Sequence, residues 1–308
     1  MKAVVLAAGK GSRLFPVTKV IAKPLLPLAN RMTIEYAFDQ LKECGIVEIC
    51  VVVGENEAEV KQALGDGSDF GVRLAYARQD QPLGLANAVA AAKSFVGQED
   101  FALYLGDAVY GDSLAPIVSL FLKSGAANVN LVKEVDDPRR FGVATIEAGR
   151  ITKLVEKPTD PESNFAMAGF YVFGPDIWDV IPRLKPSARG EYEITDAIQL
   201  LVESRKSVIA GVYTGTWFDT GTLDSFLETS RFLTRGKNLI HPTARISGKI
   251  GEGVVAGEGA IVHCANLSDS VVLPGAKIKL SGDLRHSLVG GEIHDVEIIG
   301  EIRHSALK

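Results

Sequence analysis

The chain opens with Ala3-Val4-Val5-Leu6-Ala7-Ala8-Gly9-Lys10-Gly11-Ser12-Arg13, and Lys23-Pro24-Leu25-Leu26-Pro27 follows shortly after. The apolar run predicts a buried strand, and the glycines that end it let backbone N–H groups approach a phosphate chain. Arg13 and Lys23 add cationic donors on the same side. The stretch therefore predicts an α/β fold that begins with a site for a nucleoside triphosphate.

Two commoner glycine-rich loops do not fit this stretch. A Walker A loop places Lys and then Ser or Thr after its last glycine, whereas Arg13 follows the loop here. A dinucleotide fingerprint needs a third small residue and an immediate helix, but Leu14 stands at that position and no helical pattern begins before Thr33. A simple tight turn is the remaining alternative, and the two cations argue against it.

Short apolar runs alternate with helical patterns from residue 2 to about residue 131, which is typical of βαβ units and a mostly parallel sheet. The clearest elements are helices over residues 33–44, 56–64 and 86–95, and strands over residues 48–53 and 101–107. Ligands gather at the carboxyl ends of such strands. We therefore expect Gly9, Gly11 and Asp107 to face one crevice.

The pattern changes between Gly142 and Phe173, where alternating strands with turn glycines predict a small antiparallel insertion over a substrate. Helical patterns return further along the chain, at residues 175–181, 193–204 and 223–233.

After Gly236 the chain changes character again. Apolar residues fall six apart, with glycines between the early ones: Val255, Ile261, Leu267 and Leu273. This spacing predicts rungs of a parallel β-helix, each of which buries its apolar corner on the next, with a register that weakens after Leu273. An irregular β-rich tail is the alternative. The predicted domains are residues 1–236 and 237–308.

Composition excludes several classes of protein. The 308 residues are 46% hydrophobic and 23% charged with a net charge of -5, so no electrostatic footprint for nucleic acid or anionic membrane is present. The first apolar run is too short for a signal peptide or a membrane span, which predicts a cytoplasmic protein. The three cysteines lack CxxC spacing, which argues against a disulfide framework or a zinc site.

All five histidines lie beyond residue 240. The first 240 residues therefore cannot hold a Ser-His triad, and their chemistry must depend on carboxylates, cations and metal.

Several short motifs occur in a fixed order: the glycine loop, Gln79 ahead of Pro82-Leu83-Gly84, Leu105-Gly106-Asp107, Glu156-Lys157-Pro158 and Trp217-Phe218-Asp219. Together they resemble the sugar-phosphate nucleotidyltransferases over roughly residues 1–233. Residues 64–68 and 184–196 bring the likeness closest to the glucose-1-phosphate thymidylyltransferases. The family implies a Rossmann-like α/β domain.

The reaction that this resemblance implies joins two phosphates. A sugar-1-phosphate oxygen attacks the α-phosphorus of dTTP or UTP, which gives a nucleotide-sugar and pyrophosphate, with glucose 1-phosphate as the expected acceptor. Such chemistry needs mainly positioning and charge neutralisation. N-acetylglucosamine 1-phosphate is an alternative acceptor, and a catalytically silent nucleotide-sugar-binding regulator is an alternative role.

The resemblance also implies site residues. Arg13, Lys23 and Asp107 would be catalytic, and Asp107 and Asp219 would hold Mg²⁺ through hard carboxylate oxygens. The nucleotide would contact Leu6, Ala8, Gly9, Gly11, Gln79 and Gly84, with the Gln79 amide reading thymine or uracil. The sugar phosphate would contact Gly142, Glu156, Lys157, Tyr171 and Arg189. Trp217 is expected to be packing.

Two positions depart from the family pattern. Ala8 stands where a glycine is common, and Ala108 stands where an asparagine often follows the metal aspartate. These departures bear on selectivity for base and sugar, not on the type of reaction.

The tail resembles the left-handed β-helix of long-form relatives, some of which acetylate amino sugars. Exposed rungs tend to be covered by subunits, so a homo-oligomer is expected. A second, histidine-dependent acetyl-transfer site is the alternative.

Overall fold

The computed structural model describes residues 1–306, which form two compact units. The sheet unit contains residues 1–9 and 36–217, and the stack unit contains residues 10–35 and the chain from residue 218 on. The division predicted at residues 236 and 237 is not tested by this grouping and stays a prediction. None of the described helices has the length and apolarity needed to cross a bilayer.

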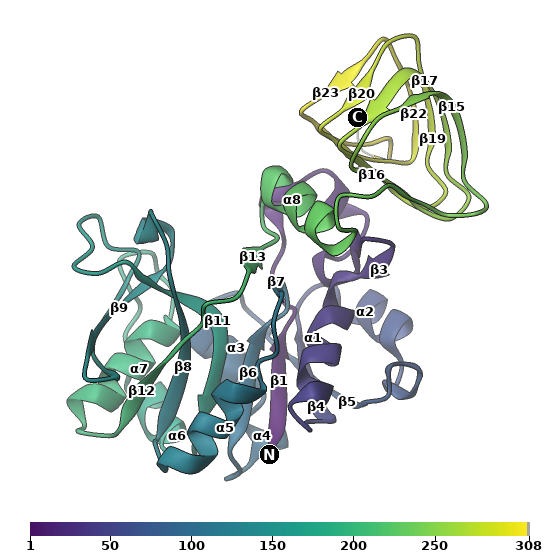
Figure 1. Ribbon diagram of the computed structural model, residues 1–308. Helices are drawn as coiled ribbons and strands as arrows, with labels where there is room; N and C mark the ends of the chain where they lie inside the picture. Colours follow the sequence, from purple (N-terminus) through teal and green to yellow (C-terminus); the bar gives the residue numbers. More distant parts are fainter. Residues whose placement is uncertain (307–308) are drawn as a thin grey trace. The chain divides into compact units, whose positions relative to one another are not determined.

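One nine-stranded sheet organises the sheet unit, in the order β5-β4-β1-β6-β11-β8-β12-β10-β9 (Figure 1). The strands are β1 (Lys2–Leu6), β4 (Glu48–Val53), β5 (Arg73–Arg78), β6 (Phe101–Leu105), β8 (Asn128–Glu134), β9 (Gly142–Glu147), β10 (Arg150–Glu156), β11 (Phe165–Phe173) and β12 (Val208–Val212). The first four in this order are parallel, as the βαβ pattern predicted.

Strand β11 does not belong to a separate covering insertion, and that expectation was wrong. It lies in the middle of the main sheet, antiparallel to both β6 and β8. Eight of its nine residues are buried, which suits a central strand covered on both faces. Only its first residues pair with β9, so the antiparallel segment grows directly out of the main sheet.

Helices cover this sheet: α1 (Thr33–Glu43), α2 (Glu57–Leu64), α3 (Leu85–Ala91), α4 (Lys93–Val96), α5 (Ala115–Ser124), α6 (Ile177–Val180) and α7 (Ile194–Glu203). The first of these begins in the stack unit and continues in the sheet unit. The helix predicted over residues 86–95 is two short helices that meet at Ala92. A short strand, β7 (Ala108–Tyr110), follows Asp107.

The stack unit begins with short turns where no long helix was predicted. These are the 3-10 turns η1 (Ser12–Leu14), η2 (Val17–Lys19) and η3 (Lys23–Leu25), followed by the hairpin of β2 (Pro27–Leu28) and β3 (Arg31–Met32). Strand β13 (Trp217–Asp219) leads into helix α8 (Leu223–Leu233). Thr222 and Ser225 form a reciprocal capping box at the start of this helix.

Parallel strands stack along the rest of this unit in two ladders. One ladder is β14 (Leu239–Ile240), β16 (Val254–Ala256), β18 (Ser270–Val272), β21 (Leu288–Gly290) and β24 (Ile302–His304). The other contains β15 (Arg245–Ile250), β17 (Ile261–Ser268), β19 (Lys277–Leu280), β20 (Leu284–Arg285), β22 (Glu292–Asp295) and β23 (Ile298–Ile299). We call residues 239–304 the C-terminal stack, which Figure 1 draws in green to yellow.

The stacking does not fade after Leu273, contrary to expectation. Val255 pairs with Val271, Val271 with Leu288, and Leu288 with Ile302. Val255, Val271 and Leu288 are buried, and Ile302 at the end is half-buried. The apolar interior of the stack contains their strand neighbours Val254, Ala256, Val272 and Val289. The hexad pattern hides this continuity because the advance from coil to coil is not constant.

Candidate active site

The carboxyl ends of β1 and β6 lie side by side. Leu6 pairs with Leu105, and the Gly106 N–H donates to the Leu6 carbonyl at 3.0 Å. A Cβ at Gly106 would lie 2.7 Å from that oxygen, so only glycine permits this approach. Gly9 and Asp107, which follow the two strands, therefore share one edge of the sheet. The expectation that Gly11 faces the same crevice stays a prediction, because Gly11 belongs to the other compact unit.

Asn56 ties the neighbouring strand end to the same edge. Its Oδ1 accepts from the Gly54 N–H at 3.1 Å, and its Nδ2 donates to the Ala7 carbonyl at 3.2 Å. A Cβ at Gly54 would lie 3.1 Å from the Ala8 carbonyl oxygen. The sequence indicated Asn56 only as a helix start, but its side chain makes no capping bond and instead forms hydrogen bonds with the backbone of Gly54 and Ala7.

Gln79 follows β5 at this edge, and its amide is engaged. The Gln79 N–H donates to the Val53 carbonyl at 2.8 Å. Its side-chain Nε2 donates to the Gly84 carbonyl at 3.1 Å and to Asn87 Oδ1 at 2.9 Å. Because these bonds use both amide donors, a base contact by this side chain must go through the acceptor Oε1, which suits the N3–H of thymine or uracil.

Gly84 joins the segment after Gln79 to Tyr192. The Tyr192 N–H donates to the Leu83 carbonyl at 2.7 Å, and the Ala86 N–H donates to the Tyr192 carbonyl at 3.0 Å. A Cβ at Gly84 would lie 2.6 Å from the Tyr192 oxygen and 2.7 Å from its nitrogen. The φ of +108° also favours glycine.

Glu156, at the end of β10, is the centre of a charged cluster. Its Oε1 lies 3.3 Å from Arg189 Nη1 and 3.4 Å from Lys157 Nζ. Its Oε2 accepts a hydrogen bond from Thr195 Oγ1 at 3.1 Å. Gly142 pairs with Glu156, and a Cβ at Gly142 would collide with the Thr195 methyl group. Four of the five predicted sugar-phosphate residues are thus brought together.

Arg189 is held by two further carboxylates. Its Nη2 lies 2.9 Å from Glu191 Oε1, and its Nη1 lies 3.4 Å from Glu193 Oε1. Ser187 donates to Glu193 at 2.9 Å, and burial raises the pKa of the Glu193 carboxyl. The sequence placed Glu193 and Thr195 in the stretch 184–196 that resembles the family and in the predicted helix of residues 193–204, but it gave neither of them a role at the site.

Tyr171, the fifth predicted sugar-phosphate residue, is 2% exposed and belongs to the core of the sheet unit. Burial, with a smaller contribution from the Glu156 charge, raises the pKa of its hydroxyl well above the ordinary value. Its place beside a bound sugar stays a prediction.

In the stack unit, Arg13 lies beside Asp219. The Arg13 Nη2 is 3.8 Å from Asp219 Oδ2, and a Cβ at Gly221 would collide with the guanidinium. Gly11 has a φ of +63° and packs on Lys23, whose Cβ would lie 3.2 Å from a Cβ at Gly11. The arginine side chain is 54% exposed, so its guanidinium is accessible to a phosphate.

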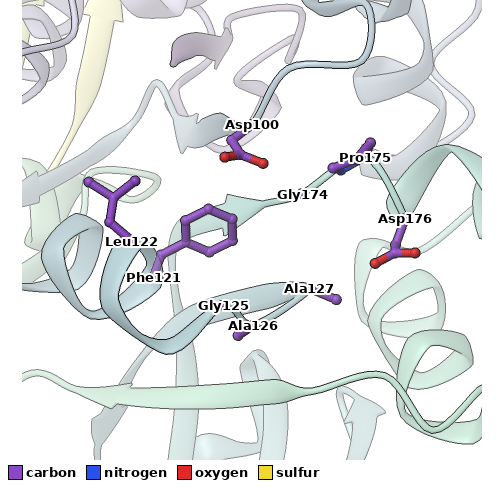
Figure 2. A pocket seen from close by; sticks show the side chains of 9 residues that line it. All are labelled: Asp100, Phe121, Leu122, Gly125, Ala126, Ala127, Gly174, Pro175 and Asp176. Carbon is purple, nitrogen blue, oxygen red and sulfur yellow. The ribbon is translucent and has the colours of Figure 1, made fainter.

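A separate hollow of about 310 Å³ lies at the opposite, amino ends of β6 and β8. Its lining includes the Phe121 ring and the carboxylates of Asp100 and Asp176 (Figure 2). Asp176 pairs with Lys206 at 2.6 Å. None of the predicted site residues lines this hollow.

The sheet is doubly wound, and its carboxyl edge carries a glycine loop and an acid. The carboxylate of Glu156 holds an arginine and a lysine. These features together form the framework of an enzyme that handles two phosphates. The chain belongs to the nucleotidyl transferase family, whose model matches residues 2–236.

The chain is similar to curated members of two kinds. Agl11 of Haloferax volcanii, a nucleotidyltransferase of low-salt glycan biosynthesis, is 43% identical over 81% of this chain and 72% of its own. A glucose-1-phosphate thymidylyltransferase of Streptomyces griseus is 33% identical over 99% of this chain and 96% of its own.

Solved structures agree with these relatives. A Bacillus anthracis protein assigned as a glucose-1-phosphate thymidylyltransferase has a TM-score of 0.70 at 38% identity, over 75% of this chain and 94% of its own. A UDP-glucose pyrophosphorylase bound to UDP-glucose has a TM-score of 0.69 at 30% identity, over 76% of this chain and 98% of its own.

Proposed function

We propose that this protein transfers the nucleotidyl group of dTTP, or of UTP, to glucose 1-phosphate and releases pyrophosphate. The cluster of Glu156, Lys157 and Arg189 supports the proposal. It places two cations within a few ångströms of a carboxylate that can accept hydrogen bonds from sugar hydroxyl groups. The similar proteins include a glucose-1-phosphate thymidylyltransferase and a UDP-glucose pyrophosphorylase, so both nucleotides are kept.

The cluster also suggests how the acceptor is bound. Without substrate, Glu156 Oε1 faces both Arg189 and Lys157. A sugar phosphate carries more negative charge than a carboxylate, so it takes these cations and leaves Glu156 to accept hydrogen bonds from the sugar hydroxyls. Arg13 and Lys23 hold the triphosphate and the departing pyrophosphate. This arrangement positions two anions for in-line attack and needs no covalent intermediate.

We propose Asp107 and Asp219 as the protein ligands of Mg²⁺. Both are partly exposed carboxylates at the ends of strands, which suits a hard cation that takes its other ligands from phosphate and water. When bound, Mg²⁺ neutralises the charge that accumulates on the phosphates.

We propose that the C-terminal stack is a left-handed β-helix and that the protein is a homo-oligomer. The support is the run of parallel pairings from β14 to β24 and the apolar interior of the stack. Acetyl transfer in this region has no comparable support.

A pyrophosphate-release screen tests the proposal. Four nucleoside triphosphates are crossed with glucose 1-phosphate, N-acetylglucosamine 1-phosphate and other sugar 1-phosphates, with Mg²⁺ present. We expect dTTP or UTP with glucose 1-phosphate to give the highest kcat/KM. A preference for N-acetylglucosamine 1-phosphate would favour the alternative acceptor, and no release with any pair would favour a silent regulator.

A further inference from the structure

Residues 10–35, which we call the phosphate segment, carry Arg13 and Lys23 and lie in the same compact unit as the C-terminal stack. The hairpin turn of this segment is Ala29-Asn30, with φ values of 48° and 58°. Asn30 Nδ2 donates to the Ala256 carbonyl at 3.2 Å and lies 3.5 Å from the Leu239 carbonyl. One side chain thus joins the segment to two neighbouring strands of the stack, β14 and β16.

A second contact joins the segment to the far end of the same ladder. Turn η2 lies against β21 and β24, and its Val17 is fully buried. Thr18, in the same turn, donates to the Gly11 carbonyl at 2.8 Å, and Gly11 packs on Lys23. The segment therefore touches the ladder at β14 and β16 and again at β21 and β24.

The segment has little internal structure with which to hold its own shape. It contains three single 3-10 turns and a hairpin of two-residue strands before α1 begins. Turns of this length have poor hydrogen-bond geometry, and an isolated hairpin is marginal in water. Its order must therefore come from what it packs against.

We propose that the C-terminal stack is a scaffold that orders the phosphate segment, and that Asn30 is a positioning residue for triphosphate binding. The kinetic part rests on the proposed function of Arg13 and Lys23. The scaffold role is additional to any part that the stack plays in oligomerisation. The scaffold role has one consequence. A substitution of Asn30, whose side chain faces the stack, alters nucleotide binding although residue 30 does not contact the nucleotide.

Full-length Asn30→Asp and Asn30→Gly test this. Aspartate keeps the size and tolerates the left-handed backbone, but it replaces the amide donor with a carboxylate that faces two carbonyl oxygens. Glycine keeps the backbone conformation and only removes the hydrogen bond. Asn266→Ala is the matched control, since Asn266 donates to Asp283 at 2.6 Å on the surface of the stack.

The readouts are amide hydrogen exchange and the two KM values. We expect Asn30→Asp to speed exchange in residues 10–35 and leave residues 101–134 unchanged. The KM for the triphosphate should rise about tenfold, as for the loss of a hydrogen bond that orders a charged site, with a much smaller change in the KM for sugar 1-phosphate. Asn30→Gly should also speed exchange in residues 10–35 and raise the KM for the triphosphate, but by less. Asn266→Ala should match the wild type in both measurements.

Exchange in residues 10–35 that is the same in the wild type and both Asn30 variants would overturn the scaffold. So would equal rises in the two KM values, which would indicate general loosening. A wild type that turns over no substrate pair would instead remove the proposed function, and the exchange result would still decide the scaffold. If the aspartate variant does not fold, the glycine variant decides in the same way.

Discussion

At the scale of single residues, close backbone approaches shape the site. Gly84 meets the backbone of Tyr192, and Gly106 meets the carbonyl of Leu6. Neither contact can be read from a lone glycine in a sequence. The likeness to a family identified Gly84, whereas Asn56, Glu193 and Thr195 were missed because they act through other protein groups.

Gly84→Ala should cost more stability than Gly125→Ala. Gly125 lies in the left-handed α region, where an alanine costs about 1–2 kcal/mol, and a Cβ there meets nothing within 4 Å. Gly84, with φ 108° and ψ 174°, lies in a region that is nearly restricted to glycine, and a Cβ there also meets Tyr192. Urea unfolding measures the difference, and the KM for the triphosphate should also rise in Gly84→Ala alone. Equal losses of stability would show that the Tyr192 contact is unimportant.

The two metal-ligand proposals are tested by Asp107→Asn and Asp219→Asn. Each removes a charged oxygen ligand, so turnover should fall by about two orders of magnitude or more, with the unfolding midpoint close to that of the wild type. Asp100→Asn, which lies at the amino end of β6, is the control and should keep full turnover. Near-normal rates in either variant, measured by pyrophosphate release over a Mg²⁺ titration, would remove that residue from the metal site.

At the scale of elements, the sequence pattern predicted the bounds of isolated amphipathic helices and of short apolar strands well. Strand β4 and helix α8 have the predicted bounds, and α1 ends one residue early. The predictions failed where packing decides: the alanine-rich pattern of residues 86–95 cannot show the break at Ala92, and a fully buried run such as β11 carries no sign of its direction or its neighbours.

Helix α8 is joined to the C-terminal stack by a titratable contact. His286 Nδ1 lies 2.6 Å from Asp269 Oδ2, and His286 Nε2 lies 2.8 Å from Asp224 Oδ1. Arg231 also faces Asp269, at 3.5 Å. The hydrogen bonds to Asp269 and then Asp224 raise the pKa of His286 above its ordinary value of 6.5.

This raised pKa predicts a pH-dependent contribution to stability. A raised folded-state pKa gives stabilisation that is complete below pH 6.5 and is lost as the pH rises through the folded value. The stability gap between the wild type and His286→Asn should therefore be larger near pH 6 than near pH 9. A gap that widens toward high pH would contradict the assignment.

At the scale of the whole molecule, the mostly parallel sheet was predictable because its strands and helices alternate along the chain. The grouping of residues 10–35 with the chain beyond residue 217 could not be predicted, because no local sequence pattern indicates a contact between segments so far apart in the chain. The later coils were missed for a related reason: Leu288 and Ile302 stack on the earlier rungs at an uneven spacing.

The stack predicts a multimer, because an end coil that pairs on one side leaves backbone groups and apolar side chains for a partner. Val296 is 66% exposed and Ile299 is 43% exposed near that end. Light scattering on the full-length protein should give an integral multiple of the monomer mass. A monomer at all concentrations tested would contradict this prediction.

The central claim is nucleotidyl transfer at the α-phosphorus, and the fate of label from dTTP tests it most directly. The protein is incubated with glucose 1-phosphate, Mg²⁺ and dTTP labelled either at the α-phosphate or at the γ-phosphate. The account predicts that α-label appears in the nucleotide-sugar and that γ-label appears only in pyrophosphate. Release of γ-label as inorganic phosphate would show that the β–γ bond is broken instead. Release of α-label as dTMP, with none in nucleotide-sugar, would show transfer to water and not to the sugar phosphate. Either result would contradict the account.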